Sequence, residues 1–318
     1  MKLLKTTAYS ILALGGATLG GLVLFTHRTA RKVRAALPPS GSFVDLPGGR
    51  LHVREQGAGP VLLLVHGLGG QMGQFTYRVV EKLAADYRVV VVDRPGSGYS
   101  QRPASADLLS QANTLAALID KLDLGRPLVV GHSMGGAVAL ALALNHPSRV
   151  AGLALVAPLS ALPETVPPMF QRLMIPSRWQ RQLVAWTVAT PLSMRRSPQV
   201  MKVLFGPETP PHDYATKAGG MLSLQPAQFL ATIADLEALP TYLPTLTARL
   251  PELQLPVRVL YGRHDAVLDW TTNGQALVGS VRGATLQLVE GGHMLPITQP
   301  DLVARFVRGE VVGEEIAG

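Results

Sequence analysis

The sequence of 318 residues predicts an α/β protein with a mostly parallel sheet that is covered by helices on both faces. One observation predicts this class, and a second predicts how the domain is organised. Short apolar runs of strand length alternate with longer segments of helical pattern, as is typical of parallel sheets buried between helices. Between residues 157 and 256 this alternation stops, which indicates an insertion into one large domain.

The first 34 residues are expected to form a separate segment. Thr6 to Thr26 carries no charge over 21 residues and lies between Lys5 and His27-Arg28. A helix of this length could cross about 30 Å of hydrocarbon, so we predict one N-terminal membrane span and a membrane-associated protein. A cleaved signal peptide, giving a secreted or periplasmic protein, is the alternative, although no Ala-x-Ala site directly follows the apolar run. The side of the membrane that the catalytic domain occupies stays open.

The formal net charge of +8 is concentrated in this first segment. Six Lys and Arg residues precede the first acidic residue, Asp45, which leaves +2 for the rest of the chain. The basic balance therefore gives no reason to expect a nucleic-acid partner. The chain has no cysteine, which excludes disulfides, zinc thiolates and a cysteine nucleophile. We expect no metal and no cofactor.

The elements after this segment follow in a regular order. A linker at residues 35–42 leads to a hairpin, because Pro47-Gly48-Gly49 separates two short strand-like runs. The predicted strands are residues 43–46, 50–55, 61–65, 88–93, 128–130, 150–156, 257–265 and 286–293. The predicted helices of the core are residues 75–85, 108–122 and 134–145.

One of these strands runs directly into a Gly-x-Ser-x-Gly turn. Gly131 and Gly135 flank Ser133, and a sharp strand-to-helix turn requires such small neighbours. The turn exposes the serine hydroxyl at the end of the sheet, and the N-terminus of the next helix adds partial positive charge where an oxyanion would form. In a chain with 32 glycines, this motif alone is a weak signal.

Three other segments place polar residues just past the end of a strand. They contain His66-Gly67, Asp265 and His293. Open α/β sheets form their sites at this carboxyl edge. The chain order Ser133, Asp265, His293 is the order that α/β-hydrolases use for nucleophile, acid and base.

The chain from about Phe43 to about Val312 resembles the α/β-hydrolase fold superfamily, and within it the esterase- and lipase-like serine hydrolases. The stretches that carry this resemblance are residues 66–70 (His-Gly-Leu-Gly-Gly), 93–100 (Asp-Arg-Pro-Gly-Ser-Gly-Tyr-Ser), 131–136 (Gly-His-Ser-Met-Gly-Gly), 262–265 (Gly-Arg-His-Asp) and 291–293 (Gly-Gly-His). The resemblance implies an eight-stranded sheet, a core at residues 43–158 and 246–318, and a helical cap at 159–245. The cap segment as a whole is then expected to line the substrate entrance, although ordinary packing is the expected role of any single apolar residue in it. These apolar residues include Met169, Phe170, Met174, Ile175, Trp179 and Trp186.

The site residues take roles that follow from serine chemistry. Ser133 is the expected nucleophile, His293 the base and Asp265 the acid that orients it, with Asp269 as a rival for the last role. The backbone N–H groups of Leu68 and Met134 are the expected oxyanion donors. Other residues are expected to support the motifs or to have no catalytic role: His66, Gly67, Gly131 and Gly135 support the turns, His132 packs, His264 lies behind the acid, and Asp235 is a surface charge of the cap.

The expected function is hydrolysis of small-molecule carboxylic esters through an acyl-enzyme. The N-terminal span and the Gly-His-Ser-Met-Gly core resemble membrane-tethered lipases that act on monoacylglycerols, so short or medium acyl esters are expected. A serine nucleophile separates the chain from dehalogenase-like and epoxide-hydrolase-like relatives, which use aspartate there. The alternatives are a carbon–carbon bond hydrolase of ring-fission products, a cofactor-free perhydrolase or haloperoxidase-like enzyme, and a non-catalytic ligand receptor.

Overall fold

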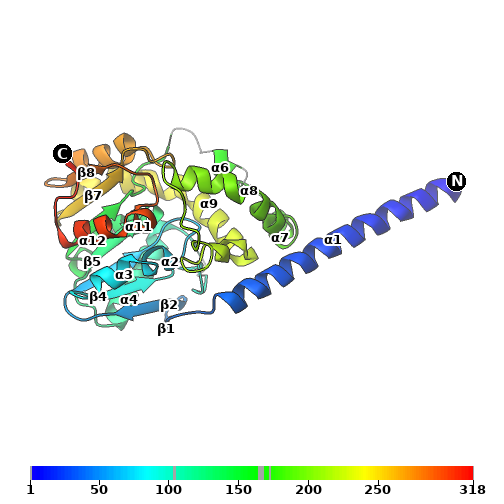
Figure 1. Ribbon diagram of the computed structural model, residues 1–318, viewed down its shortest axis with the longest axis horizontal. Coiled ribbons are helices and arrows are strands. Elements are labelled where there is room, and N and C mark those ends of the chain that lie inside the picture. Colours follow the sequence, from blue (N-terminus) through cyan, green and yellow to red (C-terminus); the bar gives the residue numbers. More distant parts are fainter. Residues whose placement is uncertain (1, 103–104, 164–167, 172, 318) are drawn as a thin grey trace.

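The protein has three layers, with a twisted sheet between two layers of helices (Figure 1). This computed structural model describes residues 2–102, 105–163, 168–171 and 173–317. Within these residues the sheet has nine strands in the order β1-β2-β4-β3-β5-β6-β7-β8-β9. The five inner pairings, from β4 to β8, are parallel, and the pairings at both edges are antiparallel. The predicted α/β class and mostly parallel sheet are confirmed.

Eight of the strands overlap the predicted runs, but β7 and β8 end earlier than predicted, at Gly262 and Val289, and a further strand lies near the C-terminus. Their bounds are β1 Ser42–Leu46, β2 Gly49–Gln56, β3 Val61–Val65, β4 Arg88–Val92, β5 Leu128–His132, β6 Gly152–Val156, β7 Val257–Gly262, β8 Thr285–Val289 and β9 Glu314–Ala317. The ninth strand is the difference from the eight-stranded expectation. Its sequence, Glu-Glu-Ile-Ala, lacks the alternation of apolar and polar residues that predicts strands. An edge strand can form without that alternation, since charged residues are tolerated there.

The helices of the core lie on both faces of the sheet (Figure 1). Their bounds are α2 Gly73–Thr76, α3 Val79–Leu83, α4 Leu108–Lys121, α5 Met134–Asn145, α10 Ala276–Ser280, α11 Leu295–Thr298 and α12 Pro300–Arg308, with short 3₁₀ turns at Pro147–Arg149 and Leu250–Glu252 and a π turn at Thr271–Gln275. The predicted helix 75–85 is in fact two short helices, α2 and α3.

The alternation of side chains along the strands divides the core into two layers. On strand β3, Leu63 and Val65 point into the layer that contains α4 and α5. Their neighbours Leu62 and Leu64 point into the opposite layer, which contains α3 and α12. All four side chains are buried, because a parallel sheet between helices has no wet face.

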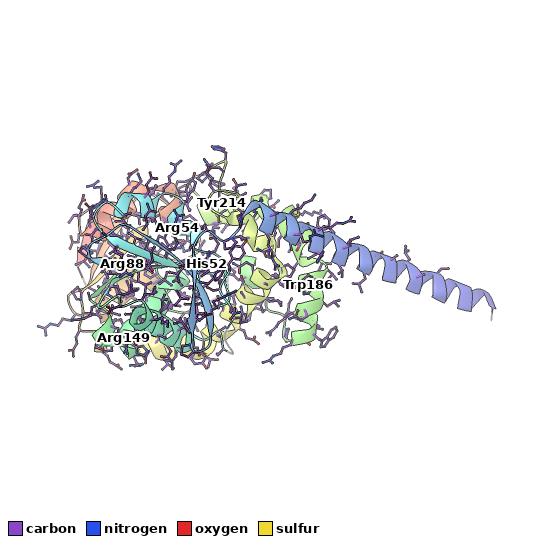
Figure 2. The ribbon with its side chains drawn as sticks, turned by 90° about the horizontal axis from the view of Figure 1, so that it is seen from below. His52, Arg54, Arg88, Arg149, Trp186 and Tyr214 are labelled. Atoms are coloured by element: carbon purple, nitrogen blue, oxygen red, sulfur yellow. The ribbon has the colours of Figure 1, made fainter. Side chains whose placement is uncertain are left out.

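The segment between β6 and β7 is helical. It holds α6 Pro168–Gln171, α7 Arg178–Trp186, α8 Ala189–Phe205, a 3₁₀ turn Gly220–Leu224 and α9 Pro226–Ala248. These helices lie beyond the carboxyl edge of the sheet, between the core and the N-terminal helix α1 (Figure 1). Figure 2 shows Trp186 of α7 on the side from which α1 projects, far from Arg88 and Arg149.

The predicted N-terminal membrane span, on which the predicted membrane association rested, is wrong. Helix α1 covers Lys2–Ala36, but none of the helices in the described part of the chain combines the length and the apolarity that crossing a bilayer requires. The prediction relied on the absence of charge, whereas a span must be predominantly apolar. Residues 6–26 include four glycines and six hydroxyl-bearing side chains.

The C-terminal part of α1 is instead occupied by contacts with the rest of the protein. Thr26, the last residue of the predicted span, is buried, and its hydroxyl donates to the Thr187 carbonyl at 3.2 Å. Ala30 and Val33 are buried as well. The Arg34 guanidinium donates to the Gln225 side-chain oxygen at 2.8 Å, so α1 is fixed against the helical segment between β6 and β7.

Candidate active site

The turn between β5 and α5 holds Ser133 in a strained backbone conformation. Its φ of +54° and ψ of −123° are unusual for a residue with a side chain. Such a conformation costs about 1–3 kcal/mol and persists only where the surrounding structure enforces it. The strain places the Ser133 hydroxyl at the carboxyl edge of the sheet, directly before the N-terminus of α5.

The glycines of this turn are required by close packing. A Cβ at Gly135 would lie 2.1 Å from the Val65 carbonyl oxygen, and one at Gly131 would lie 2.6 Å from the Gly135 carbonyl oxygen. A Cβ at Gly67 would contact the Ser133 side chain at 3.0 Å. The turn after β3 and the turn after β5 are therefore pressed together, which only glycine allows.

The structure brings Ser133, Asp265 and His293 together from three separate loops. The Oγ of Ser133 lies 3.0 Å from Nε2 of His293, and Nδ1 of His293 lies 2.7 Å from Oδ2 of Asp265. The other oxygen of Asp265 accepts the N–H groups of Val267 and Leu268 at 2.8 and 2.9 Å. These bonds fix the carboxylate, so a proton on Nδ1 leaves Nε2 free to accept the serine proton. Asp269 is not part of this chain of contacts, because it caps the turn at Thr271 and Thr272.

The N–H groups of Leu68 and Met134 lie in the two turns that meet at Ser133. Met134 is the first residue of α5, so its N–H lies at the positive end of the helix. Among the described residues neither N–H donates a hydrogen bond to another group. Leu68, Ser133, Met134 and His293 all line the same cavity.

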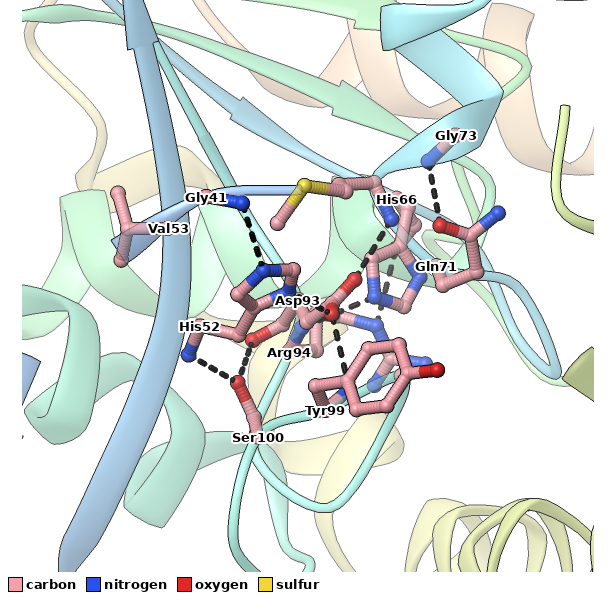
Figure 3. Close-up of polar contacts among 12 residues, drawn as sticks. Gly41, His52, Val53, His66, Gln71, Gly73, Asp93, Arg94, Tyr99 and Ser100 are labelled. Carbon is pink, nitrogen blue, oxygen red and sulfur yellow. Dashed lines mark hydrogen bonds and ion pairs between the residues drawn. The ribbon is translucent and has the colours of Figure 1, made fainter. Parts of the chain in front are cut away.

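The loop that carries Leu68 is braced by His66 and Arg94 (Figure 3). The His66 ring donates from Nδ1 to the Gly67 carbonyl at 2.8 Å and accepts the Arg94 N–H at Nε2 at 2.9 Å. Burial, with the nearby Arg94 charge, lowers the pKa of His66 well below its usual value. His66 is therefore a neutral ring that holds the loop and has no free nitrogen for base chemistry.

His132, for which the sequence predicts a packing role, contacts His293 directly. Its Nε2–H donates to the backbone carbonyl of His293 at 2.9 Å, and the two rings lie 4.9 Å apart. Burial, followed by the neighbouring His293, lowers the pKa of His132 to about 3. Its Nδ1 atom is buried and has no hydrogen-bond partner among the described residues. A neutral His132 adds no charge beside the imidazolium that His293 would become.

A cavity of about 300 Å³ opens at Ser133 and His293. Its walls are almost entirely apolar and come from α9, from the loop after β7 and from the segment around Phe170–Pro176. Its charged residues among the described part are Arg181 and Glu237, which bind each other at 2.7 Å. Of the apolar residues named above, Phe170, Met174 and Ile175 line the cavity. Trp179 and Trp186 do not line it, and Trp179 is 66% exposed. The side chain of Met169 lies outside the described residues.

A second, smaller cavity of about 60 Å³ also borders Ser133 and His293. It is more polar, because the Gly67–Gly70 turn, Gln74, His132 and Tyr214 contribute to its wall. The serine thus has a large apolar space on one side and a small polar space on another. No group of three or more His, Asp or Glu side chains in the described part of the chain is placed to hold a metal ion.

Two residues that matter to the site were misjudged or missed from the sequence. Asp235 is not a surface charge, since it is 1% exposed and pairs with the fully buried Arg94 at 3.0 Å. No sequence motif marks Gln74, whose side-chain oxygen accepts the Gly67 N–H at 2.8 Å. The Asp93-Arg94-Pro95 turn directly follows a strand, which was a usable signal for Arg94. Nothing local marks Asp235, because its partner lies 141 positions away.

Comparison with known proteins identifies the family of this chain. The family model for the alpha/beta hydrolase fold matches residues 60–300, so the chain belongs to the α/β-hydrolase fold family and is a hydrolase of this fold. The crystal structure of a membrane phospholipase A, a bacterial virulence factor, is 26% identical, with a TM-score of 0.70 over 97% of this chain and 99% of that one. A thermophilic esterase from Thermogutta terrifontis is 26% identical, with a TM-score of 0.66 over 85% of this chain and 97% of that one.

A relative that matches only part of the chain bears the name of a different activity. A 2-hydroxymuconate semialdehyde hydrolase from a Pseudomonas species (strain CF600) is 37% identical over 123 residues, which cover 37% of this chain and 44% of the relative.

Proposed function

We propose that the protein hydrolyses carboxylic esters with apolar acyl groups through an acyl-enzyme formed on Ser133. The observation that carries this proposal is the hydrogen-bonded series Ser133–His293–Asp265 at the mouth of an apolar cavity of about 300 Å³. A hydroxyl becomes a usable nucleophile when an adjacent base can take its proton. An apolar cavity beside that hydroxyl favours an acyl chain over a charged group.

The proposed reaction uses the contacts of Ser133 with His293 and of His293 with Asp265. Ser133 Oγ attacks the ester carbonyl carbon while its proton moves to His293 Nε2, and Asp265 stabilises the imidazolium that forms. The carbonyl oxygen gains negative charge and accepts the N–H groups of Leu68 and Met134. The carbon–oxygen bond then breaks, and His293 gives its proton to the leaving alcohol. Water, activated by His293, attacks the acyl-enzyme, which releases the carboxylic acid and restores the Ser133 hydroxyl.

We further propose that residues 159–245 act as the cap, with residues 43–158 and 246–318 as the catalytic core. Helix α9 supplies Ile233, Leu236 and Leu239 to the cavity wall, so this segment would set the length and width of the acyl chain. The small polar cavity would take the alcohol side of the ester. Its volume of about 60 Å³ suits a small leaving group, since one water needs about 10–15 Å³ of such space.

A carbon–carbon bond hydrolase is the second candidate. One relative that matches part of this chain is named as a hydrolase of a ring-fission product. Ring-fission products carry carboxylates, which need a cationic partner in an apolar cavity. The cation in the described wall, Arg181, is already bound by Glu237. This pairing favours neutral esters.

A panel of p-nitrophenyl esters from acetate to dodecanoate tests the proposal. We expect turnover with a maximum at short or medium chain length. A ring-fission product and a mixture of acetate with peroxide serve as parallel substrates for the competing activities. No ester turnover, together with carbon–carbon cleavage or peracid formation, would contradict the proposal, and no turnover of any kind would favour a ligand receptor.

A further inference from the structure

Arg94 is a fully buried arginine whose side chain is spread over the loop that carries Leu68. Its Nε–H donates to the His66 carbonyl at 2.9 Å, and one terminal N–H₂ group donates to the Gly67 carbonyl at 3.1 Å. The other terminal group donates to the Gln111 side chain at 2.8 Å. A guanidinium carries five N–H donors on three nitrogens in a fixed plane, whereas a lysine ammonium carries three donors on a single nitrogen and cannot reach partners this far apart.

The peptide between Gly67 and Leu68 links this arginine to the proposed oxyanion site. In a trans peptide the C=O and the N–H point in opposite directions. The Gly67 carbonyl is held toward Arg94 and the His66 ring, so the Leu68 N–H is turned to the opposite side. Leu68 lines the cavity on that side together with Ser133. The Gly67 N–H is fixed as well, because it donates to Gln74 at 2.8 Å.

Helix α9 holds Arg94 in this position. Asp235 of α9 is 1% exposed and accepts from the Arg94 guanidinium at 3.0 Å. A second residue of the same helix, Gln228, donates to the Gly70 carbonyl at 3.1 Å and accepts the Gly98 N–H at 3.0 Å. The helix that forms part of the apolar wall therefore contacts one end of the 66–70 loop directly at Gly70 and the other end indirectly through Arg94.

We propose that Arg94 is a positioning residue that orients the Leu68 N–H for oxyanion binding, and that Asp235 of the cap fixes Arg94 for this task. The inference rests on the proposed ester hydrolysis. It assigns α9 a part in transition-state stabilisation in addition to its place in the cavity wall. If Arg94 only stabilised the fold, a variant that still folds would keep the kcat of the wild type. If Arg94 orients the Leu68 N–H, a folded variant would have a lower kcat.

The first test compares Arg94→Lys and Asp235→Asn with the wild type on the best ester of the panel. We expect kcat to fall about 10- to 100-fold while KM stays within about twofold, because the loss falls on the transition state. The affinity of an alkyl boronic acid, whose tetrahedral adduct places an oxygen in the oxyanion site, should weaken by a similar factor. Asp120→Asn removes the surface ion pair with Arg149 and is the control, with unchanged kcat. An unchanged kcat in Arg94→Lys would overturn the inference.

The second test separates positioning from stability. In the double variant Arg94→Met with Asp235→Leu, both charges are replaced by apolar groups, which often restores the stability of a protein with a buried ion pair. A melting temperature near that of the wild type with a low kcat supports the positioning role. Recovery of both overturns it. If the double variant does not fold, the kcat and boronic acid affinity of Asp235→Asn decide. A wild type without ester turnover overturns the proposed function and this inference together, whereas normal turnover with insensitive variants overturns only the inference.

Discussion

His293 and Asp265 are joined by a 2.7 Å hydrogen bond between Nδ1 and Oδ2, and the side chain of Asp265 is fully buried at this contact. Because the carboxylate is held by two backbone N–H groups as well, it cannot turn away from the ring. The imidazole is therefore fixed in one orientation, with Nε2 toward Ser133.

Asp265→Asn should strongly reduce ester turnover. An amide at this position favours the wrong imidazole tautomer, and the equivalent change in the serine-protease triad costs about 10⁴ in kcat. Asp269→Asn is the matched control, because Asp269 caps a turn and should change kcat by less than about threefold. Steady-state kinetics on both variants check this prediction, and a larger loss for Asp269→Asn would mean that the acid has been misassigned.

The buried histidines should make stability depend on pH. Burial lowers the pKa of His132 to about 3, whereas the unfolded chain titrates near 6.5. Between these values the unfolded state binds a proton that the folded state does not, so the free energy of unfolding falls as pH drops below about 6.5. The contribution is about 1.4 kcal/mol per pH unit for one such group.

Urea unfolding of wild type and His132→Gln at pH 7, 6 and 5 measures this effect. The variant should lose stability less steeply with falling pH, by up to about 1.4 kcal/mol per pH unit. Identical slopes would show that folding does not lower the pKa of His132.

Filling the apolar cavity should change acyl-chain selectivity. Ile233 of α9 is buried in the wall, so Ile233→Trp would occupy part of the space of about 300 Å³. We expect turnover of octanoate and longer esters to fall at least 10-fold, while acetate turnover changes less than about threefold. Ile233→Val is the control for a change at this position that adds no volume. Equal losses for short and long esters would place the acyl chain elsewhere.

Much of this site could be predicted because its signals are local. The strained turn at Ser133 needs glycines at fixed positions, and Asp265 and His293 follow strands directly, so each leaves a short readable motif. Asp235 left no such signal. A lone acidic residue on a helix is normally solvated, and only the three-dimensional approach of Arg94 makes it a buried partner.

The N-terminal helix was misread for a related reason. Thr6–Thr26 carries no charge, which is the pattern that predicts a span, but its glycine and hydroxyl residues reduce its apolarity. Thr26 also donates a hydrogen bond to the Thr187 carbonyl. The contacts of Thr26 and Arg34 come from residues more than 150 positions away, which no window of sequence reveals.

The most direct test of the central claim is the reaction of the protein with an alkyl fluorophosphonate, which phosphonylates an activated serine with loss of fluoride. We expect one adduct per chain, mapped by peptide mass spectrometry to Ser133, with complete and parallel loss of ester turnover. His293→Ala should slow the labelling at least 10³-fold, because the base is missing. A folded Ser133→Ala protein that still hydrolyses esters, or an inactivating adduct on another residue, would contradict the account.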